Sequence, residues 1–436
     1  MDAAAGSAPA LVGGWIVDMA GVARVKYVPA ARLDDFRTVG MGASPSWSVF
    51  TADGSVAFTP ELNVVGDLRI RIDPAELREV EDGIVVAPGE LHHQDGEPSA
   101  MCARAVLRRA VAAAARAGLT ARVGAELECT LLGPDAEHAT GPTAHGWAPY
   151  GLRSSLEHSA FLVDLVRAAE RAGLRVEQLH MEFGQDQLEI SLAPTDPVSA
   201  ADDVVLGRVV VGRAAARHGM KVSFSPVPFA GEAGNGAHLH LSLETSAGPA
   251  FSGGDGPHGL GAAGSGAIAG VLETLPDLVG LYAGSTLSAR RLLPGNWAGA
   301  SLFWGLENRE AAVRLITGGP ASAHGANLEL KVVDPSANPY LAVAALLGSA
   351  RRGIELGLAL PEEMAGNPAD SGRELPALPP HQAAALDALE ASDVARELVG
   401  APVVEGILAV RRHEVAAYSG LPAADTARAF RLAWSC

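Results

Sequence analysis

Apolar and polar residues alternate in four separate segments of the chain, and this pattern predicts four half-buried strands. In the first segment, GAELECTLL, Glu126 and Glu128 alternate with alanine, leucine and cysteine. Successive side chains of a strand point to opposite faces, so both glutamates are expected on one face and the apolar residues on the core face. One such pair taken alone is explained as readily by ordinary exposure to water.

The second segment, MEFGQDQLEISL, carries Gln187, Glu189 and Ser191 on the face opposite its leucines and isoleucine. Glu182 lies just upstream of these residues. A turn around Gly184 is expected to bring Glu182 beside Glu189. The second strand therefore adds two further carboxylates to the pattern.

The third segment, GNGAHLHLSL, carries His238, His240 and Ser242 on its polar face, and the fourth, NLELKVVDP, carries Glu329 and Lys331. If the four strands share one sheet, their polar faces converge on a single cavity. The alternative is that the strands lie apart and that their acidic side chains face water.

Such convergence requires a cation. Two ionised carboxylates about 5 Å apart repel by roughly 3 kcal/mol at an effective dielectric constant of about 20. Five gathered glutamates would therefore be strongly destabilising without a counter-ion. Oxygen-rich sites with an imidazole suit Mg²⁺ or Mn²⁺ better than zinc, so the pattern predicts one of these ions.

The remaining pattern predicts two domains. Short apolar runs between residues 15 and 85 indicate a small β-rich N-terminal domain, and the polar, turn-rich stretch from Pro88 to Pro98 indicates a linker. We therefore expect an N-terminal domain at 1–97 and a larger domain at 98–436.

The larger domain is expected to begin as alternating helices and strands, because helical patterns over 101–117, from Ala160 to Arg171 and one that closes at Arg217 each end at glycine before a strand. Glycine and serine crowd residues 247–266, which predicts a surface loop. A buried helix is expected over 338–349, and the last fifty residues have a helical pattern.

Composition and net charge narrow the classes of function that the protein can have. The chain has 436 residues, 48% of them hydrophobic, and 50 Asp plus Glu against 33 Lys plus Arg give a net charge of -17. Such a surface disfavours nucleic acid and anionic membranes as partners. Three scattered cysteines, no signal-peptide pattern and no run of 18 apolar residues lead us to expect a cytoplasmic location without a membrane span.

Five basic residues stand out within 42 positions of this acidic chain, interleaved with Trp297 and Trp304. They are Arg290, Arg291, Arg309, Arg314 and Lys331. Guanidinium groups grip phosphate in bidentate fashion, and together with divalent metal ions they are typical of phosphoryl transfer. The sequence has neither a Walker A motif nor a strand-linked GxGxxG motif. For any single arginine, surface ion pairing remains the alternative.

The chain resembles the glutamine synthetase superfamily of ATP-dependent carboxylate–amine ligases. The motifs GAELE, HMEFGQDQLEI, GNGAHLHLSL, RLLPGNWAG, ENREAAVR, NLELKVVDP and ANPYL occur in the family's order. The resemblance implies an α+β fold with a small N-terminal β-grasp-like domain and a large catalytic domain. The catalytic domain is expected to contain a curved, mostly antiparallel sheet backed by helices.

The resemblance also implies a role for each candidate residue. One metal ion, near the acyl substrate, would be held by Glu128, Glu182 and Glu189, and a second ion, which bridges the ATP phosphates, by Glu126, His238 and Glu329. The other implied roles are amino-acid binding by Gly234 and Arg291, phosphate contacts by Arg309, Arg314 and Lys331, and nucleotide binding by His240 and Ser242.

The implied reaction has two steps. A substrate carboxylate attacks the γ-phosphate of ATP, and an amine then displaces phosphate from the acyl phosphate. Glutamate and an amine are therefore the expected partners, with ATP and Mg²⁺ or Mn²⁺. The family builds homo-oligomeric rings in which a neighbour's N-terminal domain completes each active site.

Two departures from the family bear on the amine. GMGASPSW around Gly42 replaces the family's Asp-Gly-Ser loop, and Trp297 replaces its flap glutamate, so the two anions that handle ammonium are missing. A tryptophan offers apolar area or a π face to a larger amine. We therefore expect a ligase that joins glutamate to an organic amine such as ethanolamine or a polyamine.

Two other functions stay open, namely an ammonia-using glutamine synthetase and a catalytically silent regulatory homologue. The acyl donor is also open, because Lys331 and Asn327 stand where the family has arginines. Lysine keeps the charge of arginine but loses its bidentate fork.

Overall fold

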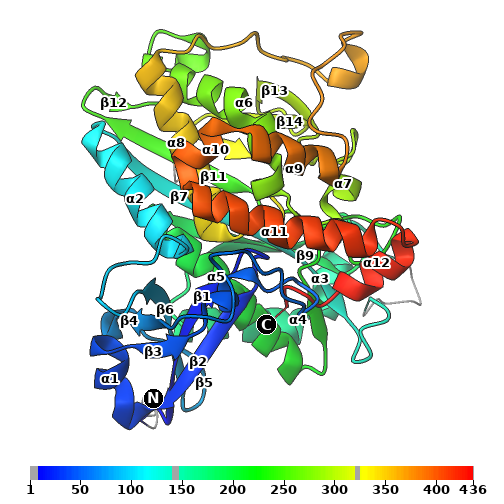
Figure 1. Ribbon diagram of the computed structural model, residues 1–436. Coiled ribbons are helices and arrows are strands. Elements are labelled where there is room, and N and C mark those ends of the chain that lie inside the picture. Colours follow the sequence, from blue (N-terminus) through cyan, green and yellow to red (C-terminus); the bar gives the residue numbers. More distant parts are fainter. Residues whose placement is uncertain (1–7, 140–146, 320–324, 436) are drawn as a thin grey trace.

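The computed structural model describes residues 8–139, 147–319 and 325–435, which form two sheets and a layer of helices (Figure 1). The first six strands form one sheet in the order β2-β1-β6-β4-β3, with β5 beside β6. Their bounds are β1 (Leu11–Val17), β2 (Ala23–Pro29), β3 (Met41–Ala43), β4 (Leu68–Ile72), β5 (Arg78–Glu81) and β6 (Ile84–His92).

Alternation along β4 explains how this small sheet packs. Leu68, Ile70 and Ile72 are buried, and the two arginines between them are partly exposed. The buried face packs against Phe36 of helix α1 (Leu33–Thr38), which is fully enclosed. The expected β-rich N-terminal region is therefore present.

The expected linker from Pro88 to Pro98 is wrong over its first half. Strand β6 runs through Pro88 to His92. Residues up to Pro88 pair with β1, and those from Gly89 pair with β4. The proline lies where the strand changes partners, so its missing N–H group interrupts neither ladder. Only residues 93–97 form a turn, closed by the bond from His93 N to Glu97 O at 2.7 Å.

Nine further strands form the second sheet, in the order β13-β14-β15-β11-β7-β9-β8, with β10 beside β7 and β12 beside β11. All of its pairs are antiparallel except β13 with β14. The strands are β7 (Thr120–Leu132), β8 (Val176–Met181), β9 (Gln187–Thr195), β10 (Lys221–Ser223), β11 (Leu239–Thr245), β12 (Gly248–Pro249), β13 (Ser301–Leu306), β14 (Ala311–Ile316) and β15 (Asn327–Leu330). The expected mostly antiparallel sheet is confirmed.

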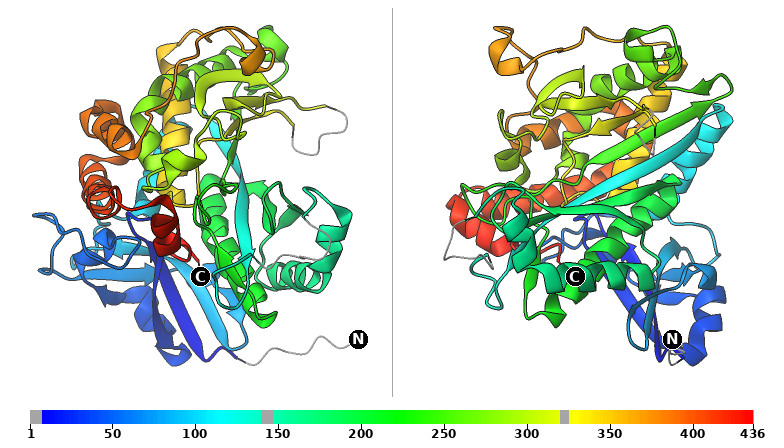
Figure 2. Two further views of the ribbon diagram at one scale, coloured as in Figure 1. Left: turned by 90° about the vertical axis from the view of Figure 1, so that its right-hand side faces the viewer. Right: turned by 180° about the vertical axis from the view of Figure 1, so that it is seen from behind.

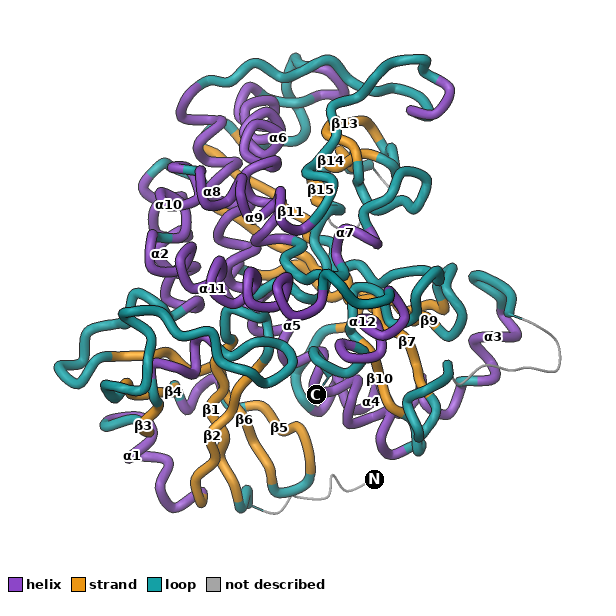
Figure 3. The backbone as a smooth tube through the Cα atoms, turned by 45° about the vertical axis from the view of Figure 1, so that its right-hand side comes forward, coloured by secondary structure: helices purple, strands orange, loops and turns teal. Residues whose placement is uncertain are grey.

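Helices gather on one side of this sheet, as Figure 3 shows for α6, α8, α9, α10 and α11. None of the helices in the described ranges is long and apolar enough to cross a bilayer. Their bounds are α2 (Ala103–Arg116), α3 (Leu152–Glu157), α4 (Ser159–Arg171), α5 (Pro197–Arg217), α6 (Ala262–Tyr282), α7 (Ser288–Arg291), α8 (Pro339–Leu356), α9 (Gln382–Ala391), α10 (Asp393–Val399), α11 (Ala401–Tyr418) and α12 (Ala423–Phe430).

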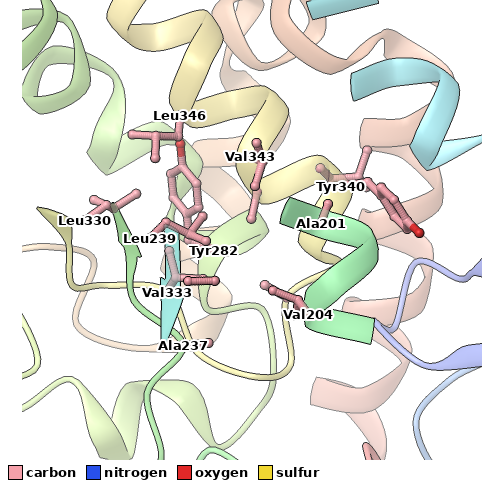
Figure 4. Close-up of a cluster of buried hydrophobic side chains, with 14 of the residues drawn as sticks. Ala201, Val204, Ala237, Leu239, Tyr282, Leu330, Val333, Tyr340, Val343 and Leu346 are labelled. Carbon is pink, nitrogen blue, oxygen red and sulfur yellow. The ribbon is translucent and has the colours of Figure 1, made fainter. Parts of the chain in front are cut away.

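The apolar face of the large sheet forms the main core. Leu239 of β11 and Leu330 of β15 lie beside Val343 and Leu346 of α8, with Val204 of α5 nearby (Figure 4). Each of these side chains is at least 95% buried. Burying one such side chain stabilises the folded state by about 1.5–3 kcal/mol. The helices therefore cover the apolar face of the sheet, and the polar face stays open.

The expected loop at 247–266 is wrong over its last residues, where α6 begins. A Cβ on Gly270 would lie 2.3 Å from Ser349 O, and one on Gly353 would lie 2.1 Å from Gly266 O. The glycines of α6 and α8 allow the two helix backbones to pack in direct contact. The glycines at the start of α6 therefore serve helix packing and do not mark a loop.

The C-terminal helices return to the N-terminal sheet, as the two views of Figure 2 show. Trp434 Nε1 donates to Ala20 O at 2.8 Å, and Arg411 Nη2 donates to the same oxygen at 3.0 Å. The backbone N–H of Ala52 donates to Glu414 Oε1 at 2.9 Å. The expected helical C-terminus is confirmed, and it joins the two ends of the described chain.

Candidate functional site

A cavity of about 720 Å³ opens on the polar face of the large sheet. It brings together twelve of the residues singled out from the sequence. They are Glu126, Glu128, Glu182, Glu189, Gly234, His238, Arg291, Trp297, Arg309, Arg314, Glu329 and Lys331. His240 and Ser242 line an adjoining cavity of about 340 Å³, which shares Glu126 with the first.

Strand register explains this convergence. Glu128 of β7 lies opposite Glu189 of β9, and His240 of β11 lies opposite Glu329 of β15. On the far side of β15, Arg314 of β14 lies opposite the same Glu329. Directly opposed residues in antiparallel strands have Cβ atoms about 4.5–5.5 Å apart, so one face collects charged side chains from five neighbouring strands.

The first group of ligand atoms surrounds Glu126. Its carboxylate lies 2.7 Å from His238 Nδ1 and 3.1 Å from His240 Nε2, and His238 Nδ1 lies 3.4 Å from Glu329. Burial opposes ionisation of Glu126, but the hydrogen bonds with the two histidines outweigh it and hold the pKa of Glu126 well below its ordinary value. Donor atoms of Glu126, His240 and Glu329 all lie within 4.8 Å of one another.

The second group combines His180, Glu182 and Glu189, whose donor atoms also lie within 4.8 Å of one another. Burial raises the pKa of Glu189 to about 10, and the charges of Glu126, Glu128 and Glu182 add to the rise. The raised pKa favours the protonated form of this carboxylate, and a neighbouring cation would favour its ionised form. A set of carboxylates with an imidazole fits a hard divalent ion, so the residues present suit the ions that the sequence suggested.

Sequence reasoning missed three residues of this site. His180 Nε2 lies 2.9 Å from Glu182 Oε1, and the phenol of Tyr150 donates to Glu182 Oε2 at 2.8 Å. Phe183 follows Glu182 directly and lines the same cavity. The spacing of His180, on β8, two residues before Glu182 was a usable signal. Tyr150 follows no pattern and is placed only by the fold.

Three basic residues lie among these acids. Arg314 Nε lies 2.7 Å from Glu329 Oε2, and Lys331 Nζ lies 3.2 Å from Glu329 Oε1. Burial lowers the pKa of Arg291, which donates to the backbone oxygens of Val332 and Lys331 at 3.2 and 3.1 Å. These three cations are held in place by the fold.

The other members of the basic cluster differ. Arg309 is exposed, lines the cavity and forms no ion pair within the described ranges, so its guanidinium group is free to meet an anion. Arg290 is exposed and does not line the cavity, and Trp304 is a core residue that is 1% exposed. These last two do not belong to the site.

Trp297 stands at the mouth of the cavity in an aromatic pair. Its ring packs edge to face against Phe183, with centroids 5.5 Å apart and planes at 86°. The two rings are 46% and 51% exposed. Trp297 has a φ of 52°, which a bulky residue rarely adopts, and Glu310 holds the turn by accepting from Gly295 N at 3.3 Å and Trp297 N at 3.1 Å.

Cavities that hold acidic ligand sets beside arginines are typical of enzymes that transfer phosphoryl groups. A comparison with known protein families gives the class: residues 100–428 match the family described as "Glutamine synthetase, catalytic domain". The protein is thus an ATP-dependent carboxylate–amine ligase, and the chain belongs to the glutamine synthetase family. Enzymes of this family use ATP and divalent metal ions.

Three similar proteins support this assignment. The γ-glutamylpolyamine synthetase GlnA3 of Streptomyces coelicolor is 38% identical over 95% of this chain and 91% of its own. A glutamine synthetase of Mycobacterium tuberculosis is 33% identical over 74% of each chain. A solved structure described as a novel glutamine synthase homolog aligns over both complete chains with a TM-score of 0.88 at 31% identity.

Proposed function

We propose that this enzyme joins glutamate, through its γ-carboxylate, to an organic amine at the expense of ATP. The observation that carries the proposal is the Trp297–Phe183 pair at the cavity mouth, where the family's flap glutamate would lie. The name of the Streptomyces relative, a γ-glutamylpolyamine synthetase, supports an amine as the nucleophile.

Two divalent ions are proposed for the cavity. Glu128, Glu182 and Glu189 would hold one, and Glu126, His238 and Glu329 the other, with His180 and His240 close to each set respectively. When bound, such ions neutralise the charge on phosphate oxygens. The raised pKa of Glu189 supports this proposal, because a bound cation would allow that carboxylate to ionise.

The chain's own residues would act on the substrates as follows. Arg291 and Gly234 would hold the amino-acid part of glutamate. A Cβ at position 234 would lie 2.4 Å from Pro226 O, so only glycine fits at this edge of the cavity without a shift of the backbone. His240 and Ser242 line the adjoining cavity, which we assign to the nucleotide.

In the first step, an oxygen of the glutamate γ-carboxylate forms a bond to the γ-phosphorus of ATP, and ADP leaves. Arg309, exposed and free of ion pairs within the described chain, is positioned to bind the oxygens of the transferring phosphoryl group. Arg314 and Lys331 would act mainly through Glu329, which both contact.

In the second step, the amine nitrogen attacks the acyl carbon, phosphate leaves and the nitrogen releases a proton. An ammonium ion gains nothing from apolar surface, whereas an alkyl chain that lies against Trp297 and Phe183 gains about 0.8 kcal/mol per buried methylene group. The proposed preference is therefore for an amine with a carbon chain, such as ethanolamine or a polyamine.

The first prediction concerns this preference. We expect kcat/KM to rise at least tenfold from ammonium to n-butylamine or 1,4-diaminobutane, measured by coupled ADP release. Trp297→Glu, which places an acid at the cavity mouth, should move the preference back toward ammonium. Leu293→Glu is the matched control, because it adds the same charge to an exposed position of the same turn outside the cavity lining.

The outcomes separate the possible functions. An enzyme that uses ammonium as well as every amine, with no change in Trp297→Glu, would be an ammonia-using glutamine synthetase. A protein that binds Mn²⁺ and ATP but releases no ADP with any amine would be a silent homologue.

We also propose a homo-oligomeric ring with active sites between subunits. Every residue that lines the main cavity in the described chain lies between 126 and 331, so the N-terminal sheet of the same chain does not reach it. A neighbouring subunit could then supply that part of the site.

A further inference from the structure

The two oxygens of the Glu128 carboxylate have different partners. Its Oε2 atom accepts a hydrogen bond from Gly236 N and another from Gln187 Nε2, each at 2.8 Å. Its Oε1 atom lies 3.7 Å from His238 Nε2. Two donors therefore fix the orientation of a side chain that is 8% exposed.

Gln187 cannot turn over in this position. Its Oε1 atom accepts from Gly184 N at 2.9 Å, and its Nε2 atom also donates to Gly234 O at 2.9 Å. Rotating the amide by 180° would place its NH₂ group against the N–H of Gly184 and its oxygen against Glu128. The side chain, which is 4% exposed, thus ties the β8–β9 turn and the Gly234 loop to Glu128.

Asn235 supports Gln187 from behind. It is fully buried, and its Nδ2 atom donates to Ser225 O at 2.9 Å and to Ser223 O at 3.3 Å. Its backbone N–H donates to Pro226 O at 3.0 Å, which closes the loop between residues 226 and 235. Its Oδ1 atom lies 3.3 Å from Gln187 Nε2. Every polar atom of this side chain is therefore engaged, as a buried amide requires.

We infer that Gln187 is a positioning residue for Glu128, and that Asn235 holds both Gln187 and the Gly234 loop in place. Partners behind a metal ligand typically change metal affinity by about 10–100-fold when they are lost. The inference rests on the proposed function, because it requires Glu128 to hold a divalent ion.

Mn²⁺ binding by the purified protein tests the inference without relying on turnover. Gln187→Met keeps a similar shape and removes both amide groups, so the Kd for Mn²⁺ measured by calorimetry should rise about tenfold or more. Gln382→Met is the matched control, because Gln382 is also a buried amide that donates to a backbone oxygen, but it lies on α9, outside the cavity lining. The control should lower Tm and leave the Kd for Mn²⁺ unchanged.

Asn235→Ser provides a second, milder variant if Gln187→Met fails to fold. It should weaken Mn²⁺ binding severalfold, since Gln187 loses its support but keeps its bond to Glu128. A folded Gln187→Met or Asn235→Ser protein with wild-type Mn²⁺ affinity would overturn the inference and leave the proposed function intact. A wild-type protein that binds no Mn²⁺ would instead contradict the proposed function.

Discussion

Glu189 shows what the site demands of a single residue. It lies opposite Glu128 across two strands, and burial together with three neighbouring carboxylates raises its pKa to about 10. The unfolded chain would ionise this group near its ordinary value of 4.5. Between pH 4.5 and about 10, Glu189 is therefore protonated in the folded, metal-free protein and ionised in the unfolded protein.

This difference predicts how stability depends on pH. Because folding raises the pKa of Glu189, this group stabilises the folded state fully below pH 4.5. As the pH rises toward 10, the free energy of unfolding falls by up to about 1.4 kcal/mol per pH unit. In EDTA, Tm should therefore fall between pH 6.5 and 8.5, and it should fall less in Glu189→Gln. Adding Mn²⁺ should raise Tm more at pH 8.5 than at pH 6.5. Equal slopes for both proteins in EDTA would contradict this account of Glu189.

At the scale of elements, the turn from 293 to 297 presents Trp297, the aromatic residue that we propose selects the amine. Its shape depends on the carboxylate of Glu310, which accepts two backbone N–H bonds while Trp297 stays at φ 52°. Conformations of this kind persist only when the surrounding structure holds them.

Removing that support should loosen the turn. Glu310→Ala is expected to raise KM for n-butylamine severalfold, with little effect on KM for ATP, because the Trp297 ring would no longer be held against Phe183. Its Tm should stay within about 2 °C of wild type, since the turn is exposed. Glu307→Ala is a suitable control, as Glu307 is exposed and does not line the cavity. An unchanged KM for the amine would show that Glu310 does not support the binding surface.

At the scale of the whole molecule, a loop of the N-terminal region carries apolar side chains that are largely exposed to solvent in the described chain. Val64 and Val65 are 73% and 77% exposed, and Phe58 of the same loop is 54% exposed. Neighbouring exposed apolar residues are typical of surfaces that contact another protein. This surface agrees with the proposed ring, in which an N-terminal sheet would approach the cavity of a neighbour.

Light scattering tests the assembly. The wild-type protein should run as an oligomer, and Val64→Asp with Val65→Asp should shift it to smaller species and reduce activity. Val163→Asp, at an exposed position of α4, is the control that adds charge to a different surface. A wild-type monomer with full activity would rule out a site shared between subunits.

The sequence by itself determined which side chains share a face. Period-two alternation fixed Glu126 with Glu128 and His238 with His240, because a strand has no other way to place them. The motif order gave the family, and the net negative charge made nucleic acid and anionic membranes less favourable partners. Local patterns also located α2 and α4 to within a few residues, because apolar periodicity and terminal glycines are local properties. They missed α6, and they ended α8 at residue 349, although it continues to Leu356.

Only the tertiary structure decided which faces meet. The pairing of β7, β9, β11 and β15 is non-local, so no local pattern could show that Tyr150 reaches Glu182 or that Phe183 meets Trp297. The same reason explains the errors. Pro88 indicated a linker, but it lies in a strand that pairs with distant partners, and Gly266 indicated a loop, but it lies where α6 packs against α8. A residue's local preference is set by its neighbours in sequence, whereas its role here is set by neighbours that the fold brings from far along the chain.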